Sequence, residues 1–150
     1  MAIATGLAEA GATIVVNDIC PDKLEAAKAE YAANGITAHT YVLDVTDEAA
    51  VEATIPVIEE EVGPIDILVN NAGIIMRVPI LEMEDKDFRQ VLDIDLAGPF
   101  IMGKAVAKRM IERGITRKPV SCCLKHGQVV EGPARSIKGN WEMTLEVVSA

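Results

Sequence analysis

The residues from Ile65 to Gly73 constrain the fold most, because a continuous apolar run ends abruptly in polar and small residues. Ile65-Asp66-Ile67-Leu68-Val69 has the composition of a short strand buried in a parallel sheet. Asn70-Asn71-Ala72-Gly73 follows at the strand end, where doubly wound sheets bind their ligands. The same run also fits a buried strand followed by an ordinary Asn-Gly turn. The flanking sequence must therefore decide between a ligand turn and a plain one.

Alternating patterns along the chain predict an α/β fold. Apolar spacing predicts helices over residues 2–10, 21–34, 46–61 and 85–113, and strand-forming residues occupy 13–18, 37–43 and 65–69. This order predicts a partial Rossmann-like fold: a doubly wound parallel sheet in three α/β/α layers, with right-handed crossovers. No strand precedes the first helix, so we expect the first strand of such a fold to be absent.

Several residues predict local features of the two longer helices. Thr46 is the expected N-cap of the helix over 46–61, and Pro56 predicts a kink or a shorter first segment. Its inner stripe is expected at Val51, Ile55 and Ile58, with the acidic run 59–61 as a solvated face. In the helix over 85–113, Gly98-Pro99 predicts a bend.

Composition divides the chain at residue 113 and excludes several function classes. Residues 1–113 carry nine basic and 20 acidic residues, whereas residues 114–150 carry five and three. We expect one domain over 1–113 and an atypical tail over 114–150, with short segments at 119–124 and 141–148. The net charge of −9 argues against nucleic acid, and no apolar run approaches the roughly 18 residues of a membrane span. Three cysteines without metal-ligand spacing favour a reducing cytoplasm and no metal site.

Polar residues close all three expected strands, at Asn17-Asp18, at Asp44-Val45 and at Asn70 to Gly73. The carboxyl ends of parallel strands share one edge, so these clusters should converge on one crevice. Asp18 is placed to accept hydrogen bonds from an adenosine ribose, and it would repel a 2′-phosphate, which favours NAD over NADP. Asp18 and Asp44 are equally compatible with a capping or turn role.

With these flanks the sequence resembles the short-chain dehydrogenase/reductase family over about residues 2–113. The resemblance rests on Gly11 to Asp18, Leu43-Asp44-Val45-Thr46 and Gly63 to Gly73, where Asn-Asn-Ala-Gly after a strand is the family hallmark. Segments 74–83 and 87–96 look most like members that act on sugar acids such as gluconate. The resemblance implies that residues 1–113 form a truncated NAD(P)-binding Rossmann-like domain. It also implies hydride transfer between nicotinamide and such a substrate.

The resemblance also assigns expected roles to matching positions. Asp18 matches the ribose-binding acid of the family, and Asp44 and Val45 match the pair beside the adenine. Asn71, Ala72 and Gly73 match the backbone that runs along the adenosine, and Ile94 matches a residue near the ribose. Asp95 stands where many members have a catalytic Asn that holds a water in the proton relay. An ionised carboxylate cannot donate a hydrogen bond there. A helix residue paired with a nearby cation is therefore an equal alternative for Asp95.

Two family motifs do not occur in the 150 residues. The resemblance implies a Thr-Gly-x-x-x-Gly-x-Gly phosphate loop before residue 2, and Gly6 lies inside the first expected helix. It also implies a catalytic Ser and a Tyr-x-x-x-Lys after the long helix, but no Tyr follows Arg113, and the surroundings of Ser121 do not match. We expect a fragment with an internal start and an out-of-frame or foreign tail. Such a chain should bind NAD weakly or not at all and turn over nothing.

A function from a different class remains open. The chain is equally compatible with a non-catalytic nucleotide-binding or oligomer-forming module, with a homo-oligomer formed through the helix over 85–113. Unpaired strand edges and uncovered apolar helix faces would also favour aggregation.

Overall fold

The computed structural model describes residues 2–114 and four short strands beyond them. In the first part, helices and strands alternate: α1 Ala2–Glu9, β1 Ile14–Asp18, α2 Pro21–Ala33, β2 Ala38–Val42 and α3 Glu48–Glu61. A long helical rod follows, which consists of α4 Asp85–Leu92, the π-helical turn η1 Asp93–Ala97 and α5 Gly98–Glu112. The four strands further along are β3 Gly127–Val129, β4 Ala134–Arg135, β5 Trp141–Glu142 and β6 Leu145–Val147. The α/β class predicted from the sequence is confirmed.

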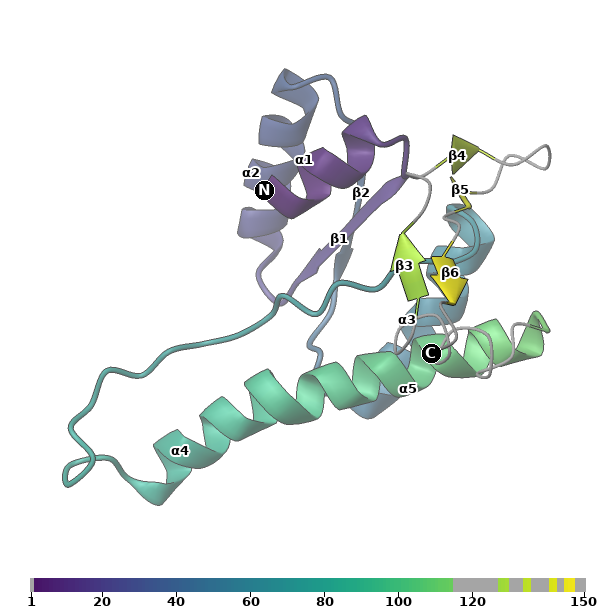
Figure 1. Ribbon diagram of the computed structural model, residues 1–150. Helices are drawn as coiled ribbons and strands as arrows, with labels where there is room; N and C mark the ends of the chain where they lie inside the picture. Colours follow the sequence, from purple (N-terminus) through teal and green to yellow (C-terminus); the bar gives the residue numbers. More distant parts are fainter. Residues whose placement is uncertain (1, 115–126, 130–133, 136–140, 143–144, 148–150) are drawn as a thin grey trace.

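A two-stranded parallel sheet lies at the centre of the described fold. β1 pairs with β2 in a register that sets Ile14 opposite Ala38 and Asp18 opposite Val42. Helices α1 and α2 cover one face of this sheet, and α3 and α5 lie on the other (Figure 1). The pair therefore has the expected α/β/α layering, and its carboxyl edge ends at Asp18 and Val42.

Two apolar clusters hold these layers together. On one face, Ile14, Tyr31 and Ala38 are buried, with side chains of α1 packed against them. The larger cluster joins α3, α5 and the end of β2, and its buried members are Leu43, Val51, Ile55, Ile58, Met102, Ala105 and Val106. The predicted inner stripe of α3 is confirmed, since its spacing brings these side chains onto one face of the helix.

The strand predicted over residues 65–69 is wrong. This segment has no strand assignment, and the side chains of Ile67 and Val69 are 52% and 43% exposed rather than buried. An extended segment becomes a strand only when a neighbour supplies the other half of the hydrogen-bond ladder. In the described part of the chain, β1 pairs only with β2, and no strand is hydrogen-bonded to residues 65–69.

The ends of α3 also differ from their prediction. Asp47, not Thr46, is the N-cap: its carboxylate accepts a hydrogen bond from the Ala50 amide at 3.0 Å. Thr46 instead donates to Asp44. A single helix continues through Pro56, so the shorter first segment does not occur. Gly63 follows the helix with φ +129°, a conformation that favours glycine and turns the chain toward residue 65.

The helix predicted over 85–113 is confirmed in extent but not in its internal geometry. The expected irregularity at Gly98-Pro99 is a π-helical turn directly before it, closed by a hydrogen bond from the Gly98 amide to the Asp93 carbonyl. The apolar side chains of α4 and η1 remain largely exposed, whereas α5 packs Met102, Ala105 and Val106 against α3.

The described part of the tail contains only short antiparallel pairs. β3 pairs with β6, and β4 pairs with β5. Strands therefore account for the expected segment near 141–148, while the segment expected over 119–124 lies outside the described residues. A domain boundary at residue 113 stays a prediction, although α5 ends at Glu112.

Candidate functional site

Asp18 lies at the carboxyl end of β1 and is partly buried. Its Oδ1 accepts a hydrogen bond from the Cys20 amide at 2.8 Å, which forms the turn into α2. One carboxylate oxygen therefore shapes the turn, and among the described residues no hydrogen bond to Oδ2 is found. Both sequence-based roles for Asp18, turn former and hydrogen-bond acceptor for a ligand, fit this arrangement.

Asp44 and Val45 follow β2 at the same edge of the sheet. Asp44 Oδ1 accepts hydrogen bonds from the amide and hydroxyl of Thr46, at 2.9 and 2.7 Å. This double contact fixes the turn between β2 and α3 and confirms that Asp44 shapes a turn. The backbone also joins the two strand ends, since the Leu43 amide donates to the Asp18 carbonyl at 3.1 Å.

The turn from Asn71 to Gly73 is exposed and lies against the π-helical turn η1. Asp95 Oδ1 accepts a hydrogen bond from the Ile74 amide at 2.9 Å. A Cβ on Gly73 would lie 3.3 Å from the same oxygen, so glycine permits this approach of the carboxylate. Ile94, one residue before Asp95, is partly buried.

The π-helical turn brings two of the predicted clusters together. Gly98 is buried against Val45, and a Cβ on Gly98 would lie only 2.8 Å from Val45 Cγ2. Three residues earlier, Asp95 contacts Gly73 and Ile74. Residues 95–98 therefore contact both the turn after β2, through Val45, and the turn that includes Gly73. π-Helical turns of this kind occur often at functional sites, and no periodicity in the sequence indicated this one.

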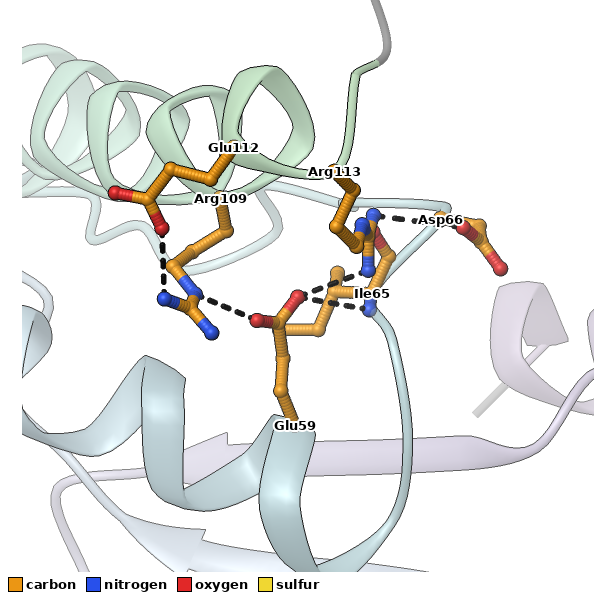
Figure 2. Close-up of polar contacts among 6 residues, drawn as sticks. All are labelled: Glu59, Ile65, Asp66, Arg109, Glu112 and Arg113. Atoms are coloured by element: carbon orange, nitrogen blue, oxygen red, sulfur yellow. Dashed lines mark hydrogen bonds and ion pairs between the residues drawn. The ribbon is translucent and has the colours of Figure 1, made fainter.

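A polar cluster that sequence reasoning missed fixes the start of the segment 65–73. Glu59 accepts hydrogen bonds from Arg109 Nε at 2.6 Å and from Arg113 Nη1 at 2.9 Å (Figure 2). Arg113 Nη2 also donates to the Ile65 carbonyl at 2.7 Å. The Glu59 side chain is only 8% exposed, so its predicted place on a solvated face is wrong. Its neighbours Glu60 and Glu61 are exposed as predicted.

The electrostatics of Glu59 follow from these partners. Burial alone raises the pKa of a carboxyl group, but hydrogen bonds from Arg109 and the Ile65 amide and the charges of Arg113 and Arg109 outweigh it. The pKa of Glu59 is therefore lowered, and the group is charged at neutral pH. The signal available in the sequence was the spacing of Arg109 and Arg113, which places both guanidinium groups on one side of α5.

Among the described residues, no group of three or more His, Cys, Asp or Glu side chains could hold a metal ion. None of the helices described in the structure has the length and apolar character needed to cross a membrane.

Comparison with known proteins decides the family. The sequence profile of the short chain dehydrogenase family matches residues 1–117. The chain belongs to the short-chain dehydrogenase family. The family resemblance recognised from the Asn-Asn-Ala-Gly run and its flanks is confirmed, and the match ends near the point where the composition changes.

Relatives within the short-chain dehydrogenase family include sugar-acid enzymes. A 2-dehydro-3-deoxy-D-gluconate 5-dehydrogenase of Formosa agariphila is 57% identical over 114 residues, which are 75% of this chain and 43% of the relative. A solved gluconate 5-dehydrogenase of Burkholderia cenocepacia, in complex with NADP and tartrate, matches with 44% identity and a TM-score of 0.67. The matched region covers 75% of this chain and 44% of the chain in that structure. The chain thus spans less than half the length of these relatives.

The cofactors of solved family members are of both kinds. The gluconate 5-dehydrogenase structure contains NADP, whereas a xylitol dehydrogenase structure contains NAD⁺. The latter is 39% identical, covers 73% of this chain and 43% of its own, and has a TM-score of 0.68. Family members related to this chain therefore bind NAD or NADP.

Proposed function

We propose that this chain carries the adenosine side of a nicotinamide cofactor site of the gluconate 5-dehydrogenase type. The observation that carries the proposal is the convergence of three polar turns: Asp18 and Asp44 at one sheet edge, and Gly73 beside Asp95 on the π-helical turn. In a complete enzyme of this type, a hydride moves between nicotinamide and the carbonyl or alcohol carbon of a sugar acid such as gluconate.

Individual residues support cofactor binding in different ways. Asp18 would accept hydrogen bonds from the ribose hydroxyls with the oxygen not used by Cys20. Its negative charge opposes a 2′-phosphate, which supports NAD as the preferred cofactor. Asp44, Val45 and Ile94 would line the adenine and ribose, and the exposed backbone from Asn71 to Gly73 would run along the adenosine.

Proton transfer is the part of the reaction that these residues do not supply. Exchange of a proton with the substrate oxygen needs a positioned acid or base, the task of a Tyr with a lowered pKa in this family. The two tyrosines of the sequence are committed elsewhere: Tyr31 is buried in the apolar cluster, and Tyr41 donates to Glu61 at 2.7 Å. Hydrogen bonding to Glu61 and burial raise the pKa of Tyr41, which opposes a role as base.

A polypeptide of these 150 residues is therefore expected to form no NADH from D-gluconate and NAD⁺. The measurement is absorbance of NADH over hours at high enzyme concentration, with a gluconate 5-dehydrogenase of full length as the positive control. NADH formation above the rate of a heat-denatured sample would overturn the proposal that proton transfer needs residues outside this chain.

Exposed apolar side chains favour a second function, an oligomer-forming module. In the described part of the rod, Leu96 is 67% exposed and Phe100 is 70% exposed. A groove beside Phe100 has Gly103, Ala107 and Ile111 in its lining, and charged side chains of Lys104, Lys108 and Glu112 border it. Apolar side chains grouped in this way indicate a contact surface. The molar mass from light scattering separates the two functions. An oligomer-forming module is at least a dimer, whereas the cofactor site does not require a dimer.

A further inference from the structure

Both ends of the segment from Ile65 to Ile74 are attached to the same helical rod. Arg113, just past the end of α5, donates from Nη2 to the Ile65 carbonyl at 2.7 Å. Asp95, in the π-helical turn, accepts from the Ile74 amide at 2.9 Å. The segment runs along the rod in the opposite direction, from the end of α5 back toward α4 (Figure 1).

The lengths of the two paths match. From Asp95 to Arg113 the rod rises by about 27 Å, at about 1.5 Å per residue. From Ile65 to Ile74 an extended chain spans about 30 Å, at about 3.3 Å per residue. The two lengths are comparable, so a segment that stays largely extended can make both attachments at once.

At the Ile65 end, the Ile65 amide also donates to Glu59 Oε1 at 3.4 Å, and few other contacts among the described residues hold this segment. No strand pairs with it among the described residues, and Ile67 and Val69 are largely exposed. Only Ile65 and Leu68 pack against the apolar cluster of α3 and α5. In an extended chain a slip by one residue turns every side chain to the other face. The two attachments are thus the contacts that define which residues face the rod.

The attachment at Arg113 is itself fixed from α3. Glu59 accepts a hydrogen bond from Arg113 Nη1 at 2.9 Å, and Arg109 holds the second carboxylate oxygen at 2.6 Å (Figure 2). The Arg113 side chain is 24% exposed and also lies 3.5 Å from Asp66. Because a guanidinium group has a planar fork of donors, Arg113 can contact Glu59 and the Ile65 carbonyl at once.

We propose that Asp95 and Arg113 form a two-point tether that sets the position of the Asn71-Ala72-Gly73 turn. Both are positioning residues: they hold the backbone that presents the turn. The assignment of the turn to the adenosine side rests on the proposed function, but the tether itself is a property of the chain without cofactor.

Hydrogen exchange of the Ile74 amide, together with ¹⁵N order parameters of the backbone over 66–74, tests the tether when both are measured by NMR without NAD. Asp95→Ala removes the acceptor for the Ile74 amide, so exchange of this amide should rise about tenfold and the order parameters across the segment should fall. Asp95→Asn keeps a side-chain oxygen that can accept from this amide, so it should restore slow exchange. Asp93→Ala is the matched control, because Asp93 is an exposed acid of the same turn without a side-chain contact among the described residues. It should leave the exchange unchanged.

Arg113→Gln tests the other attachment. The order parameters should fall at Ile74 as well as near residue 66, since a tether transmits loosening along its length. Loosening confined to the mutated end, an equal effect of Asp93→Ala, or failure of Asp95→Asn to restore slow exchange of the Ile74 amide would each overturn the tether. Circular dichroism of the α3 and α5 helices separates this local loosening from global unfolding. No cofactor is present in this experiment, so its result tests the tether alone. A separate measurement of NAD binding tests the proposed function alone.

Discussion

Replacement of Ile55 by alanine is expected to lower the free energy of unfolding by about 3 kcal/mol, within a range of roughly 2–5 kcal/mol. Ile55 is 2% exposed and lies in the cluster that joins α3 to α5 and the end of β2. Truncation removes three methyl or methylene groups from water-free surroundings and leaves a cavity, because neighbours on a helix relax only in part. The measurement is urea unfolding followed by circular dichroism.

Val57→Ala is the matched control for this prediction. Val57 is on the same helix but 42% exposed, so its truncation should change the free energy of unfolding by less than about 0.5 kcal/mol. If Ile55→Ala does not fold, Ile55→Val should still show a loss of about 1 kcal/mol. Equal effects at residues 55 and 57 would contradict the placement of this core.

Replacement of Glu59 by glutamine is expected to cost about 2 kcal/mol, since hydrogen bonds to charged groups contribute roughly 1.5–3 kcal/mol. Glutamine has the same size but no charge, so Arg109 and Arg113 lose their shared carboxylate. Their side chains are 37% and 24% exposed, and partial hydration limits the penalty of leaving them unpaired. Glu60→Gln is the matched control, because Glu60 is exposed beside it, and its effect should stay within about 0.5 kcal/mol.

The cost of Glu59→Gln should depend on pH in a defined direction. The pKa of Glu59 is lower in the folded chain than its ordinary value, so the charged group stabilises the folded state above the unfolded-state pKa of about 4.3. This stabilisation is lost as the pH falls through the lower folded-state pKa. The difference between wild type and Glu59→Gln should be constant from about pH 6 to about pH 7 and should shrink below about pH 4. A difference that grows on acidification would contradict the ion pairs.

Local patterns were sufficient for much of the fold. The spacing of Val51, Ile55 and Ile58 places three side chains on one face of a helix wherever that helix packs, so the core stripe of α3 could be predicted. The segments 13–18 and 37–43 are rich in strand-forming residues, and they contain the strands β1 and β2, which pair in parallel.

Features that depend on distant partners could not be predicted from local pattern. A strand over 65–69 needs a neighbouring strand, and the described residues offer none there. Glu59 looks solvated beside Glu60 and Glu61, because the arginines that pair with it come 50 and 54 residues later. Gly98 looks like a helix breaker in the sequence, whereas in the structure it gives Val45 the space to pack against α5.

The candidate site shows the same division. The residues that follow β1 and β2 could be named from the sequence, since the carboxyl edge of a parallel sheet brings them together. The link from Asp95 to the Ile74 amide could not, because it depends on the π-helical turn. The roles of Asp18, Asp44, Val45, Ile94 and Asp95 toward a cofactor stay predictions.

Thermal unfolding with and without NAD tests the central claim most directly, namely that these 150 residues hold the adenosine side of the site without the rest. At about 10 mM NAD and a Kd of about 1 mM or weaker, the stabilisation is at most about 1.4 kcal/mol, which is a rise of a few degrees in Tm. We predict a rise of that size, and no rise at all would contradict the claim that these residues hold the adenosine side. A stabilisation of about 4 kcal/mol, which requires a Kd near 10 μM, would contradict the account.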